Sequence, residues 1–522
     1  MSVSLKEQVE LRNGGGRAKL KVPRMKLGQL LPSVETGPVS GPADVEIQSV
    51  TYDSRKATSG GLFFALHGEK LDGAKFVDDA IGRGAIAVAS AAARPERLPK
   101  SVAWIELLPG SERRSLAQVA ANWYGHPAGA LKLVGVTGTN GKTTTTFLVD
   151  SIVRSAGHEA GLIGTTGYRT PKGSKPAGNT TPESLDLQEM FAEVRDAGGT
   201  HVVLEASSHA LAMERLWGCH FAVAIFTNLT RDHLDYHKTF EDYFAAKRLL
   251  FDSTGAGAPD VAVINADDTY SAQLSGLARR TLTYGLHTAA DLTAKSLKLS
   301  FQGLRFTADT PAGSVNVQSP LVGRINVYNI LAAIGAGIGL GISSSKIAEG
   351  IANLDLVPGR FQTIDEGQPF LVVVDYAHTD DALRNLIATA RELGPASRII
   401  TVFGAGGERD RMKRPLMGEA AGSLSDFVLL TSDNPRGEDP LRIINDVVVG
   451  LQRVNAKYRI EPEREQALAA AIEEARPGDI VLLAGKGHET YQVLASSTIE
   501  FDDREKAREI LRRKGYSKVA TG

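Results

Sequence analysis

The sequence predicts an α/β protein of three domains: a small N-terminal α/β domain, a central domain with a P-loop-type, mainly parallel sheet covered by helices on both faces, and a C-terminal Rossmann-like domain. Length is the first observation behind this prediction, because 522 residues are several times the roughly 150 of an ordinary domain. The second is that short apolar strand patterns alternate with helical stretches in the middle of the chain, and again after Pro358-Gly359-Arg360. Such alternation is typical of parallel sheets built from βαβ units.

The N-terminal domain is expected over residues 25–125. Apolar runs at residues 61–66 and 85–89 are separated by glycine and aspartate turns, which indicates short strands. Residues 1–24 have no sustained periodicity and contain three consecutive glycines, so we predict a disordered tail there. The tail also lacks the apolar segment of about 7–15 residues that a signal peptide requires.

The central domain is expected over residues 126–356 and the C-terminal domain over residues 357–522. The apolar run at residues 330–342 falls short of the roughly 20 residues of a membrane span, so we expect a buried helix there and no span. Within the central domain a helix should begin near Thr143. The predicted strands are residues 131–136, 200–205, 222–227 and 261–265 in the central domain, and 370–375, 398–403, 426–431 and 479–484 in the C-terminal domain.

Composition and charge exclude several classes of protein. A hydrophobic fraction of 42% with 23% charged residues is that of a globular protein, not of a disordered, collagen-like or coiled-coil chain. Lys+Arg 59 against Asp+Glu 60 leaves a formal charge of -1, so there is no general electrostatic reason to bind nucleic acid or an anionic membrane. The single cysteine, Cys219, rules out an intrachain disulfide and fits a reducing compartment, so we expect the cytoplasm.

The strongest local pattern lies between the predicted strand at residues 131–136 and the helix that follows. It reads Gly135-Val136-Thr137-Gly138-Thr139-Asn140-Gly141-Lys142-Thr143-Thr144. Backbone N–H groups of a glycine turn can surround polyphosphate oxygens, Lys142 adds a full positive charge, and Thr143 can bind Mg²⁺. The strict form of the pattern has glycine where this chain has Val136. We predict a phosphate-binding loop; the alternative is a glycine turn with a solvated lysine.

Several further motifs accompany the phosphate loop at residues 137–144: Glu205-Ala206-Ser207-Ser208-His209, Thr227-Asn228-Leu229, Asp232-His233-Leu234-Asp235 and Asn326-Val327-Tyr328-Asn329. Together these motifs resemble those of a known family, the ATP-dependent Mur ligases of peptidoglycan synthesis. The resemblance runs from about Met25 to the C-terminus, and it implies three domains that hold a UDP-sugar, ATP and an incoming amino acid.

The resemblance implies a nucleotide site with two Mg²⁺ ions, the first held by Thr143 and Glu205 and the second by His233 and Lys247. It further implies that Lys247 is carbamylated by CO₂, which turns a cation into an oxygen ligand of the kind that Mg²⁺ prefers. Lys142, Lys247 and His233 are the expected catalytic residues. The residues expected to bind ATP, as a substrate, are Gly138, Thr139, Asn140, Gly141, Lys142, Thr143, Thr144, Asn326, Arg360 and Asp375.

Each of these positions also has an ordinary structural interpretation. Without the resemblance, Lys247 in its helix-like segment is a surface lysine whose stem packs on apolar neighbours. His233 is equally a core histidine with its hydrogen bonds satisfied, and Asn326 and Asn329 are residues that cap a helix.

For the UDP-sugar peptide the resemblance implies Ser54 in the N-terminal domain, and Thr180, Thr181, Ser207 and Arg215 in the central domain. Arg215 is suited to a carboxylate or phosphate partner. The alternative for the three hydroxyl residues of the central domain is an ordinary turn or cap.

For the incoming amino acid the resemblance implies Arg409, the tetrapeptide Asp433-Asn434-Pro435-Arg436, Gly485 and Glu489. The tetrapeptide resembles that of ligases that add meso-diaminopimelate, whereas its structural alternative is a plain β-turn. The segment Gly404-Ala405-Gly406-Gly407-Glu408-Arg409 lacks the third glycine of a dinucleotide fingerprint.

The activity implied by the resemblance is an ATP-dependent ligase, active as a monomer, that adds meso-diaminopimelate to a UDP-muramoyl dipeptide through an acyl phosphate. The alternatives are a lysine-adding Mur ligase, a folylpolyglutamate synthetase or, in another class, a nucleotide-dependent switch. The tetrapeptide and the uridine-type N-terminal domain argue against the first two. The sequence lacks the Asn-Lys-x-Asp guanine signature, and a switch has no use for a metal-binding Lys247, so both observations argue against the third.

Overall fold

The computed structural model describes residues 24–68, 72–252 and 254–517. The chain forms two compact units, Met1–His126 and Pro127–Gly522. Nearly all of the predicted N-terminal tail lies outside the described residues. No helix in the described ranges is long and apolar enough to cross a membrane.

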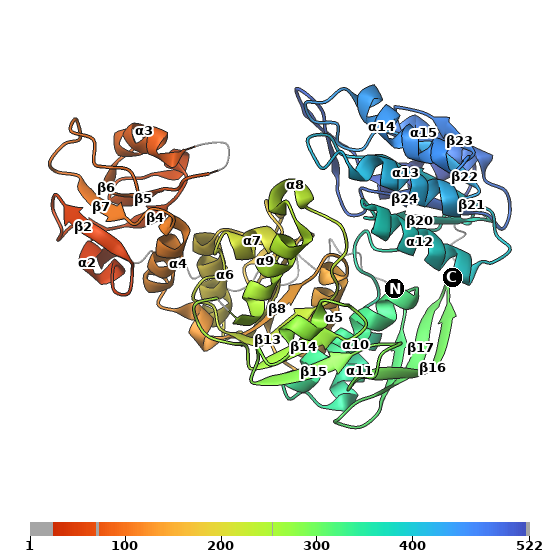
Figure 1. Cartoon of the computed structure of the whole chain (residues 1–522), viewed down its shortest axis with the longest axis horizontal. Coiled ribbons are helices and arrows are strands. Elements are labelled where there is room, and N and C mark those ends of the chain that lie inside the picture. Colours follow the sequence, from red (N-terminus) through yellow and green to blue (C-terminus); the bar gives the residue numbers. More distant parts are fainter. Residues whose placement is uncertain (1–23, 69–71, 253, 518–522) are drawn as a thin grey trace. The chain divides into compact units, whose positions relative to one another are not determined.

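The first unit is built on a five-stranded sheet with the strand order β2-β7-β6-β5-β4 (Figure 1). The pairs are parallel except β2 with β7. The apolar runs predicted as strands are β5 and β6, and α3 packs against one face of this sheet. The elements are β1 (Met25–Lys26), α2 (Leu27–Leu30), β2 (Thr36–Ser40), β3 (Glu46–Ile47), β4 (Ser49–Thr51), β5 (Gly61–Ala65), α3 (Val77–Gly82), β6 (Ala85–Ser90), β7 (Ala103–Leu107) and α4 (Glu112–Trp123), with 3-10 turns at Ser54–Lys56 and Gly73–Phe76.

The second unit begins with an eight-stranded sheet of order β11-β10-β9-β12-β8-β13-β14-β15. The six strands β9, β12, β8, β13, β14 and β15, which are neighbours in that order, are parallel. Only the two pairs that β10 forms, with β9 and with β11, are antiparallel. After β8 the chain crosses to β9 on one side and later returns to β13 on the other, so the end of β8 lies at a topological switch point, where ligands of such sheets bind. The strands are β8 (Lys132–Thr137), β9 (Ala160–Gly164), β10 (Gly167–Thr170), β11 (Gly173–Lys175), β12 (His201–Glu205), β13 (Phe221–Phe226), β14 (Val261–Asn265) and β15 (Arg280–Tyr284).

Helices cover both faces of this sheet because its strands are apolar on both sides. Val134 and Val203 pack with α5, α10 and α11 in one core, whereas Leu133 and Val202 pack with α6 and α9 in the other. The predicted buried helix at residues 330–342 overlaps the C-terminal part of α10, which ends at Gly339. The helices are α5 (Lys142–Ser155), α6 (Ser184–Asp196), α7 (Ser208–Ala212), α8 (Leu234–His237), α9 (Phe240–Asp252), α10 (Arg324–Gly339) and α11 (Ser344–Ala352), with 3-10 turns at Pro127–Ala130 and Ser271–Leu274.

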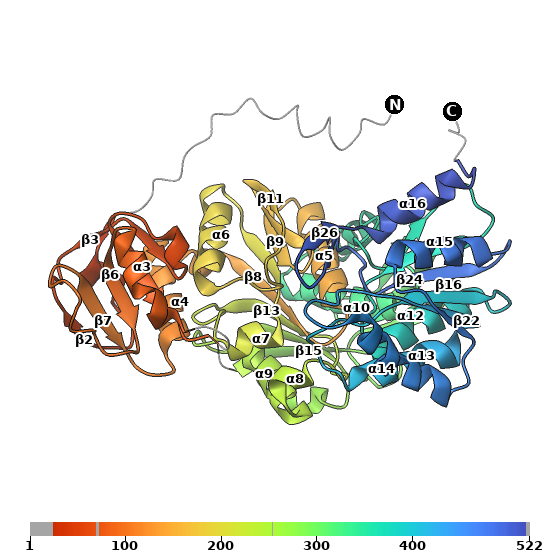
Figure 2. The same cartoon turned by 90° about the horizontal axis from the view of Figure 1, so that it is seen from above.

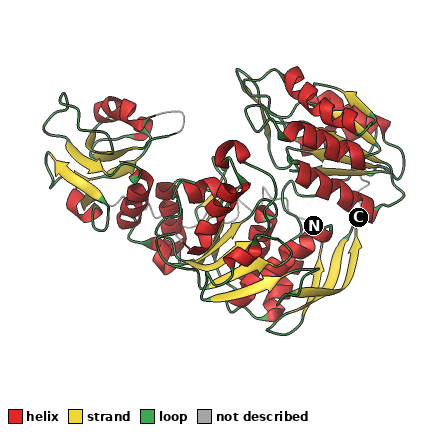
Figure 3. Cartoon of the chain, viewed as in Figure 1, coloured by secondary structure: helices red, strands yellow, loops and turns green. Residues whose placement is uncertain are grey.

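A small antiparallel sheet, which the sequence analysis did not predict, follows β15 (Figure 3). Its strands are β16 (Thr293–Ser300), β17 (Gly303–Asp309) and β18 (Val315–Ser319). Leu304, Phe306 and Val317 turn one face of it into the same core as α10.

The C-terminal part carries a six-stranded sheet of order β19-β20-β24-β21-β22-β23, parallel except for β19 with β20. The helices α12, α13 and α14 cover one face and α15 and α16 the other (Figure 2). The elements are β19 (Gln362–Ile364), β20 (Leu371–Asp375), α12 (Asp380–Leu393), β21 (Ile399–Phe403), α13 (Lys413–Leu424), β22 (Phe427–Leu430), α14 (Pro440–Arg453), β23 (Tyr458–Ile460), α15 (Arg464–Glu474), β24 (Ile480–Ala484), β25 (Tyr491–Val493), β26 (Thr498–Glu500) and α16 (Asp503–Arg513). The predicted fold class is therefore confirmed, while the exact domain boundaries stay predictions.

Candidate active site

The predicted phosphate loop connects β8 to α5 at the switch point of the larger sheet. Gly138 and Gly141 have φ values of 141° and 88°, a region that favours glycine. Side chains would not fit there either, because a Cβ on Gly138 would lie 1.9 Å from Thr227 Oγ1 and one on Gly141 2.5 Å from Asn329 Oδ1. The loop is thus held tightly between β13 and α10 at the N-terminus of α5, the arrangement that binds phosphate groups.

Two lysines converge on this loop from different helices. Lys142 Nζ donates to the carbonyl oxygens of Gly138 and Thr139, at 2.9 and 2.8 Å, and Lys247 Nζ on α9 donates to Gly138 O at 2.8 Å. Lys247 is only 1% exposed. Burial and the neighbouring charge of Lys142 lower the pKa of Lys247 well below its ordinary value. The structure therefore excludes the alternative of a surface lysine, and the lowered pKa makes the neutral amine, the form that can react with CO₂, more accessible than in an ordinary lysine.

The expected metal-binding oxygens of β12 and α5 lie together. Thr143 Oγ1 donates to Glu205 Oε1 at 3.0 Å, and Thr165, from the turn after β9, donates to the same carboxylate through both N–H and Oγ1. Within residues 24–68, 72–252 and 254–517, no three His, Cys, Asp or Glu side chains come together as a metal site. The residues present fit Mg²⁺ if phosphate oxygens and a carbamate on Lys247 complete the ligand set, since Mg²⁺ prefers oxygen.

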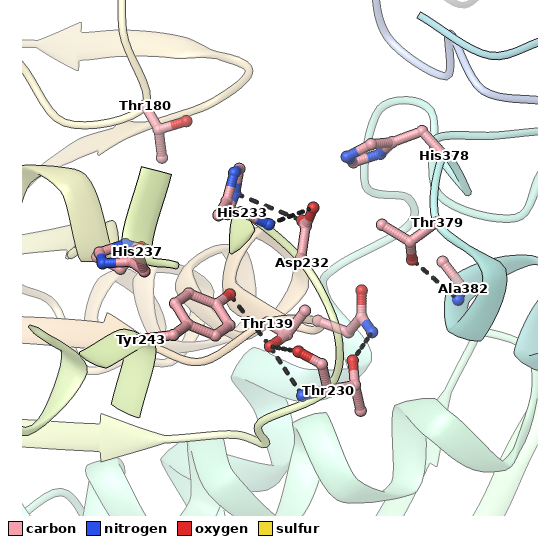
Figure 4. A network of polar contacts seen from close by, with 12 residues as sticks. Thr139, Thr180, Thr230, Asp232, His233, His237, Tyr243, His378, Thr379 and Ala382 are labelled. Atoms are coloured by element: carbon pink, nitrogen blue, oxygen red, sulfur yellow. Dashed lines mark hydrogen bonds and ion pairs between the residues drawn. The ribbon is translucent and has the colours of Figure 1, made fainter. Parts of the chain in front are cut away.

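His233 stands at the edge of the same region, in the segment before α8 (Figure 4). Its Nε2 lies 3.4 Å from Asp232 Oδ2, and its ring meets that of Tyr243 at 6.1 Å between centroids. The Tyr243 hydroxyl in turn lies 3.2 Å from Thr139 Oγ1. The His233 side chain is 44% exposed, so it is not the satisfied core histidine of the structural alternative.

Arg360 reaches the loop from the segment that precedes the C-terminal sheet. Its Nη2 donates to Thr143 Oγ1 at 3.1 Å, its guanidinium lies 4.6 Å from the centre of the Tyr376 ring, and its Nη1 is buried without a hydrogen-bond acceptor among the described residues. A buried guanidinium N–H without an acceptor costs free energy, so this group is suited to an anionic ligand. Asp375, at the end of β20, instead accepts the N–H groups of Phe361 and Ala377 and so shapes the backbone around Arg360.

One cavity of about 250 Å³ joins these groups. Asn326 and Asn329 line it from α10, where Asn329 Nδ2 donates to Asn326 Oδ1 at 2.9 Å. Tyr376, Ala377 and His378 line it from the C-terminal part. Of the predicted site residues it collects Thr139, Asn140, Gly141, Lys142, Thr143, Thr144, Thr180, Glu205, Ser207, His233, Lys247, Asn326, Arg360 and Asp375.

Of the residues expected to hold the muramoyl peptide, Thr180 and Ser207 line this cavity, whereas Thr181 and Arg215 are not among its lining residues. Several of their polar groups are used within the protein. Thr181 Oγ1 donates to Glu205 O at 2.6 Å, and Ser207 caps α7 by accepting the Ala210 N–H. Arg215 Nε lies 3.0 Å from Glu183 Oε1, and Nη1 donates to Thr181 O. Their contact with substrate stays a prediction. Ser54 belongs to the first unit, where it is buried and helps to lower the pKa of the Asp79 carboxyl.

The residues expected to hold the incoming amino acid meet at the carboxyl ends of β21, β22 and β24. Asn434 Nδ2 donates to Glu489 Oε2 at 2.9 Å, and Arg436 Nη1 donates to Gly407 O at 2.8 Å. The charge of Arg409, which is exposed, acts on Arg436. The tetrapeptide is more than a plain β-turn, because the hairpin of β25 and β26 is tied to it through Gln492 and Val493. Pro435 and Gly485 complete this group.

A ring contact links this cluster to the nucleotide cavity. The Tyr376 ring, under Arg360, lies 5.0 Å from the His488 ring between centroids, and His488 precedes Glu489. Tyr376 thus lies between the Arg360 guanidinium and the loop that carries Glu489.

Sequence reasoning missed several residues of this region. Asp381 at the start of α12 accepts Asn140 Nδ2 at 2.7 Å and so joins the phosphate loop to the C-terminal part. Thr165 and Tyr243 were not predicted, nor was Lys486. Lys486 is fully buried and 3.2 Å from Glu489 Oε2; its place in Gly485-Lys486-Gly487-His488-Glu489 was the only signal available for it.

Comparisons with known proteins agree with these observations. Three family models match: "Mur ligase family, catalytic domain" at residues 46–124, "Mur ligase middle domain" at residues 136–337 and "Mur ligase, glutamate ligase domain" at residues 359–487. A Solibacter usitatus protein named UDP-N-acetylmuramoyl-L-alanyl-D-glutamate--2,6-diaminopimelate ligase is 53% identical over 495 residues, 94% of this chain and 99% of that protein. A Geobacillus kaustophilus protein of the same name is 45% identical over 94% of this chain and 100% of that one.

A solved structure of a UDP-N-acetylmuramoyl-L-alanyl-D-glutamate--2,6-diaminopimelate ligase matches with a TM-score of 0.64 and 34% identity, over 95% of this chain and 100% of the other. A structure of MurF from Acinetobacter baumannii, 20% identical with a TM-score of 0.64, shares the fold. Family models, relatives and solved structure thus agree over nearly the whole length, and the chain belongs to the Mur ligase family.

Proposed function

We propose that this chain is an ATP-dependent amide ligase of peptidoglycan synthesis that joins meso-diaminopimelate to the D-glutamate side chain of UDP-N-acetylmuramoyl-L-alanyl-D-glutamate. The observation that carries the proposal is that the phosphate-loop cavity and the cluster around Arg436 belong to one compact unit and are linked by the contact between Tyr376, which lines the cavity, and His488, which precedes Glu489. The 53% identity to the Solibacter usitatus ligase over 94% of the chain supports the same substrates.

The reaction has two stages. A carboxylate oxygen of D-glutamate attacks the γ-phosphorus of ATP, and the bond to ADP breaks, which gives an acyl phosphate. The amine of diaminopimelate then attacks the acyl carbon, loses a proton and displaces inorganic phosphate. Both stages concentrate negative charge on oxygen atoms, so fixed donors that meet this charge in a site shielded from water lower the barrier.

In this scheme Lys142 and the N–H groups at the start of α5 bind the phosphates, and Arg360 Nη1 is available to the transferred group. Thr143, Glu205, His233 and carbamylated Lys247 would hold two Mg²⁺ ions, which when bound would screen the phosphoryl and carboxylate oxygens. Carbamylation removes the repulsion that a second ammonium beside Lys142 would exert on a metal ion. At the other end Arg436 would pair with the carboxylate of diaminopimelate that lysine lacks.

The remaining parts of the proposal concern the cellular compartment, the oligomeric state and the role of the first unit. The one cysteine, Cys219, is free and buried, as suits the reducing cytoplasm where we propose that the enzyme acts as a monomer. Ser54 and its surroundings in the first unit would hold the uridine end of the substrate.

A panel assay tests the proposal. Purified protein is incubated with UDP-muramoyl dipeptide, ATP and Mg²⁺ and, separately, with meso-diaminopimelate, L-lysine or L-glutamate, while ADP release and product mass are measured. Product should form with diaminopimelate. If ADP is released with L-lysine and not with meso-diaminopimelate or L-glutamate, the protein is the lysine-adding relative instead.

A further inference from the structure

Lys486, in the loop after β24, is completely buried, and no role in the site described above is assigned to it. A charged lysine is almost never fully buried unless it is paired, because removing its ammonium from water is costly. Its partners therefore indicate what it is for.

Among the residues that the structure describes, every polar contact of Lys486 Nζ is made with a residue proposed to hold the incoming amino acid. The nitrogen lies 3.2 Å from Glu489 Oε2, 3.3 Å from Asn434 Oδ1 and 3.7 Å from Asp433 Oδ1. The Tyr491 ring lies beside it, with its centre 5.8 Å away. The Lys486 ammonium thus contacts the side chains of Asp433, Asn434 and Glu489 at the same time.

One consequence concerns the orientation of Asn434. Its Oδ1 accepts the Val493 N–H at 2.9 Å as well as Lys486, so its Nδ2 is the atom that donates to Glu489 Oε2. Asn434 Nδ2 and Lys486 Nζ therefore both donate to the same oxygen of Glu489, Oε2. Because a hydrogen bond to a charged group is stronger than one between neutral groups, Lys486 helps to hold the Asn434 amide and the Glu489 carboxylate in one arrangement.

The second consequence is the charge of the pocket. Asp433 and Glu489 bring two negative charges and Lys486 one positive charge, which leaves a single net negative charge. Arg464, whose charge also acts on both carboxylates, is neutralised by Asp503 at 2.6 Å, with both side chains fully buried. Asp433 Oδ1 is buried and has no hydrogen-bond donor among the described residues, so a donor from a ligand would satisfy it.

This charge matches the far end of diaminopimelate, which carries one ammonium and one carboxylate. Arg436 supplies a positive charge for the carboxylate. The group of Asp433, Glu489 and Lys486, with one net negative charge, supplies the partner for the ammonium. Without Lys486, two carboxylates would compete for one ammonium, and the surplus negative charge would be buried without a partner, which is strongly unfavourable.

We propose that Lys486 is a positioning residue that sets the charge of the amino-acid pocket: it pairs with Asp433 and Glu489 so that together they present one negative charge to the far ammonium of the substrate. The proposal rests on the proposed function. It adds a determinant of substrate binding that does not itself need to touch the substrate.

Charge arithmetic provides the test. Lys486→Met keeps the length of the side chain but makes the net charge of the three residues -2, Glu489→Gln makes it 0, and the double variant returns it to -1. We expect Lys486→Met and Glu489→Gln each to raise KM for diaminopimelate by about 10- to 100-fold, with KM for ATP within twofold. The double variant should have a lower KM for diaminopimelate than either single variant.

The matched control is Lys346→Met. Lys346 pairs with Glu349 at the same three-residue spacing but is 46% exposed, and its replacement should change no kinetic constant. If Lys486→Met does not fold, as judged by thermal unfolding, the double variant is compared with Glu489→Gln alone, and the double variant should still bind diaminopimelate more tightly.

Two results would overturn the proposal: a double variant whose KM for diaminopimelate equals or exceeds that of the poorer single variant, or equal losses in KM for ATP and for the amino acid. Failure of the proposed function looks different. If the wild-type protein used lysine and not diaminopimelate, the substrate would be reassigned, and the same order of variants would be measured with lysine, which also brings an ammonium to this end of the pocket.

Discussion

Replacement of Arg436 by alanine tests how this enzyme would distinguish diaminopimelate from lysine. Arg436 Nη1 donates to Gly407 O at 2.8 Å and to Asn434 O at 3.3 Å. No contact of Nε or Nη2 with another described residue accompanies them, so we expect these two atoms to meet a substrate carboxylate. The residue has a φ of 52°, which is uncommon for a side chain other than glycine and is typical of residues held in place for function.

The expected preference follows from these contacts. A charge-assisted pair contributes about 1.5–3 kcal/mol, and each 1.4 kcal/mol is about tenfold. When lysine binds, Arg436 keeps both carbonyl acceptors on Nη1, so only the pair is lost and not the larger stabilisation of a fully buried cation. Wild-type protein should therefore prefer diaminopimelate by roughly 10- to 100-fold in kcat/KM.

The assay measures kcat/KM for both amino acids in four proteins. Arg436→Ala should lose most of the preference by impairing diaminopimelate far more than lysine. Arg436→Lys should recover only part, because an ammonium cannot form the planar paired contact. Arg442→Ala, an exposed arginine of α14 in the same domain, is the control and should match wild type. Equal kcat/KM of the wild-type protein for the two amino acids would refute the reasoning.

Three further predictions follow from buried charges. Lys142→Ala should lower kcat by roughly 10²–10³ or more, since one fixed donor to developing charge is lost; steady-state ADP release measures it, and activity within about threefold of wild type would remove the loop assignment. Lys247→Ala should be nearly inactive and partly rescued by acetate, which replaces a carbamate; an active variant would show that no anion is needed there. Arg464→Met leaves the carboxylate of Asp503 buried and unpaired, so it should lower the free energy of unfolding by about 3–5 kcal/mol, measured by denaturant unfolding, and an unchanged midpoint would contradict this.

The strands that the sequence predicted correctly are those with continuous apolar runs. Residues 131–136, 261–265 and 479–484 correspond to β8, β14 and β24, which are buried on both faces, so nearly every residue is apolar. The small sheet of β16, β17 and β18 was missed. Buried positions in β17 and β18 are interrupted by more exposed ones, and β16 has no fully buried residue. Because β16 also shows few apolar residues, local pattern alone does not distinguish it from a loop.

The parts of the candidate site that could be predicted are those whose residues lie close together in the sequence. The phosphate loop is one case, because glycine spacing, Lys142 and the strand–helix context act locally. Asp381 was not predictable, because its bond to Asn140 joins residues 241 positions apart. Arg215 illustrates the opposite case: its charge suggested a substrate partner, and the local sequence did not reveal that Glu183 lies 3.0 Å from it. Pairing over long distances depends on the assembled fold.

An oxygen-labelling experiment tests the central claim most directly. UDP-muramoyl dipeptide carrying ¹⁸O in the side-chain carboxylate of D-glutamate is incubated with ATP, Mg²⁺, diaminopimelate and the wild-type protein. If a carboxylate oxygen attacks the γ-phosphorus, that oxygen leaves with phosphate, and mass spectrometry should find one ¹⁸O atom in the inorganic phosphate released with ADP, together with the diaminopimelate-containing product. Unlabelled phosphate, or AMP and pyrophosphate in place of ADP and phosphate, would contradict the account.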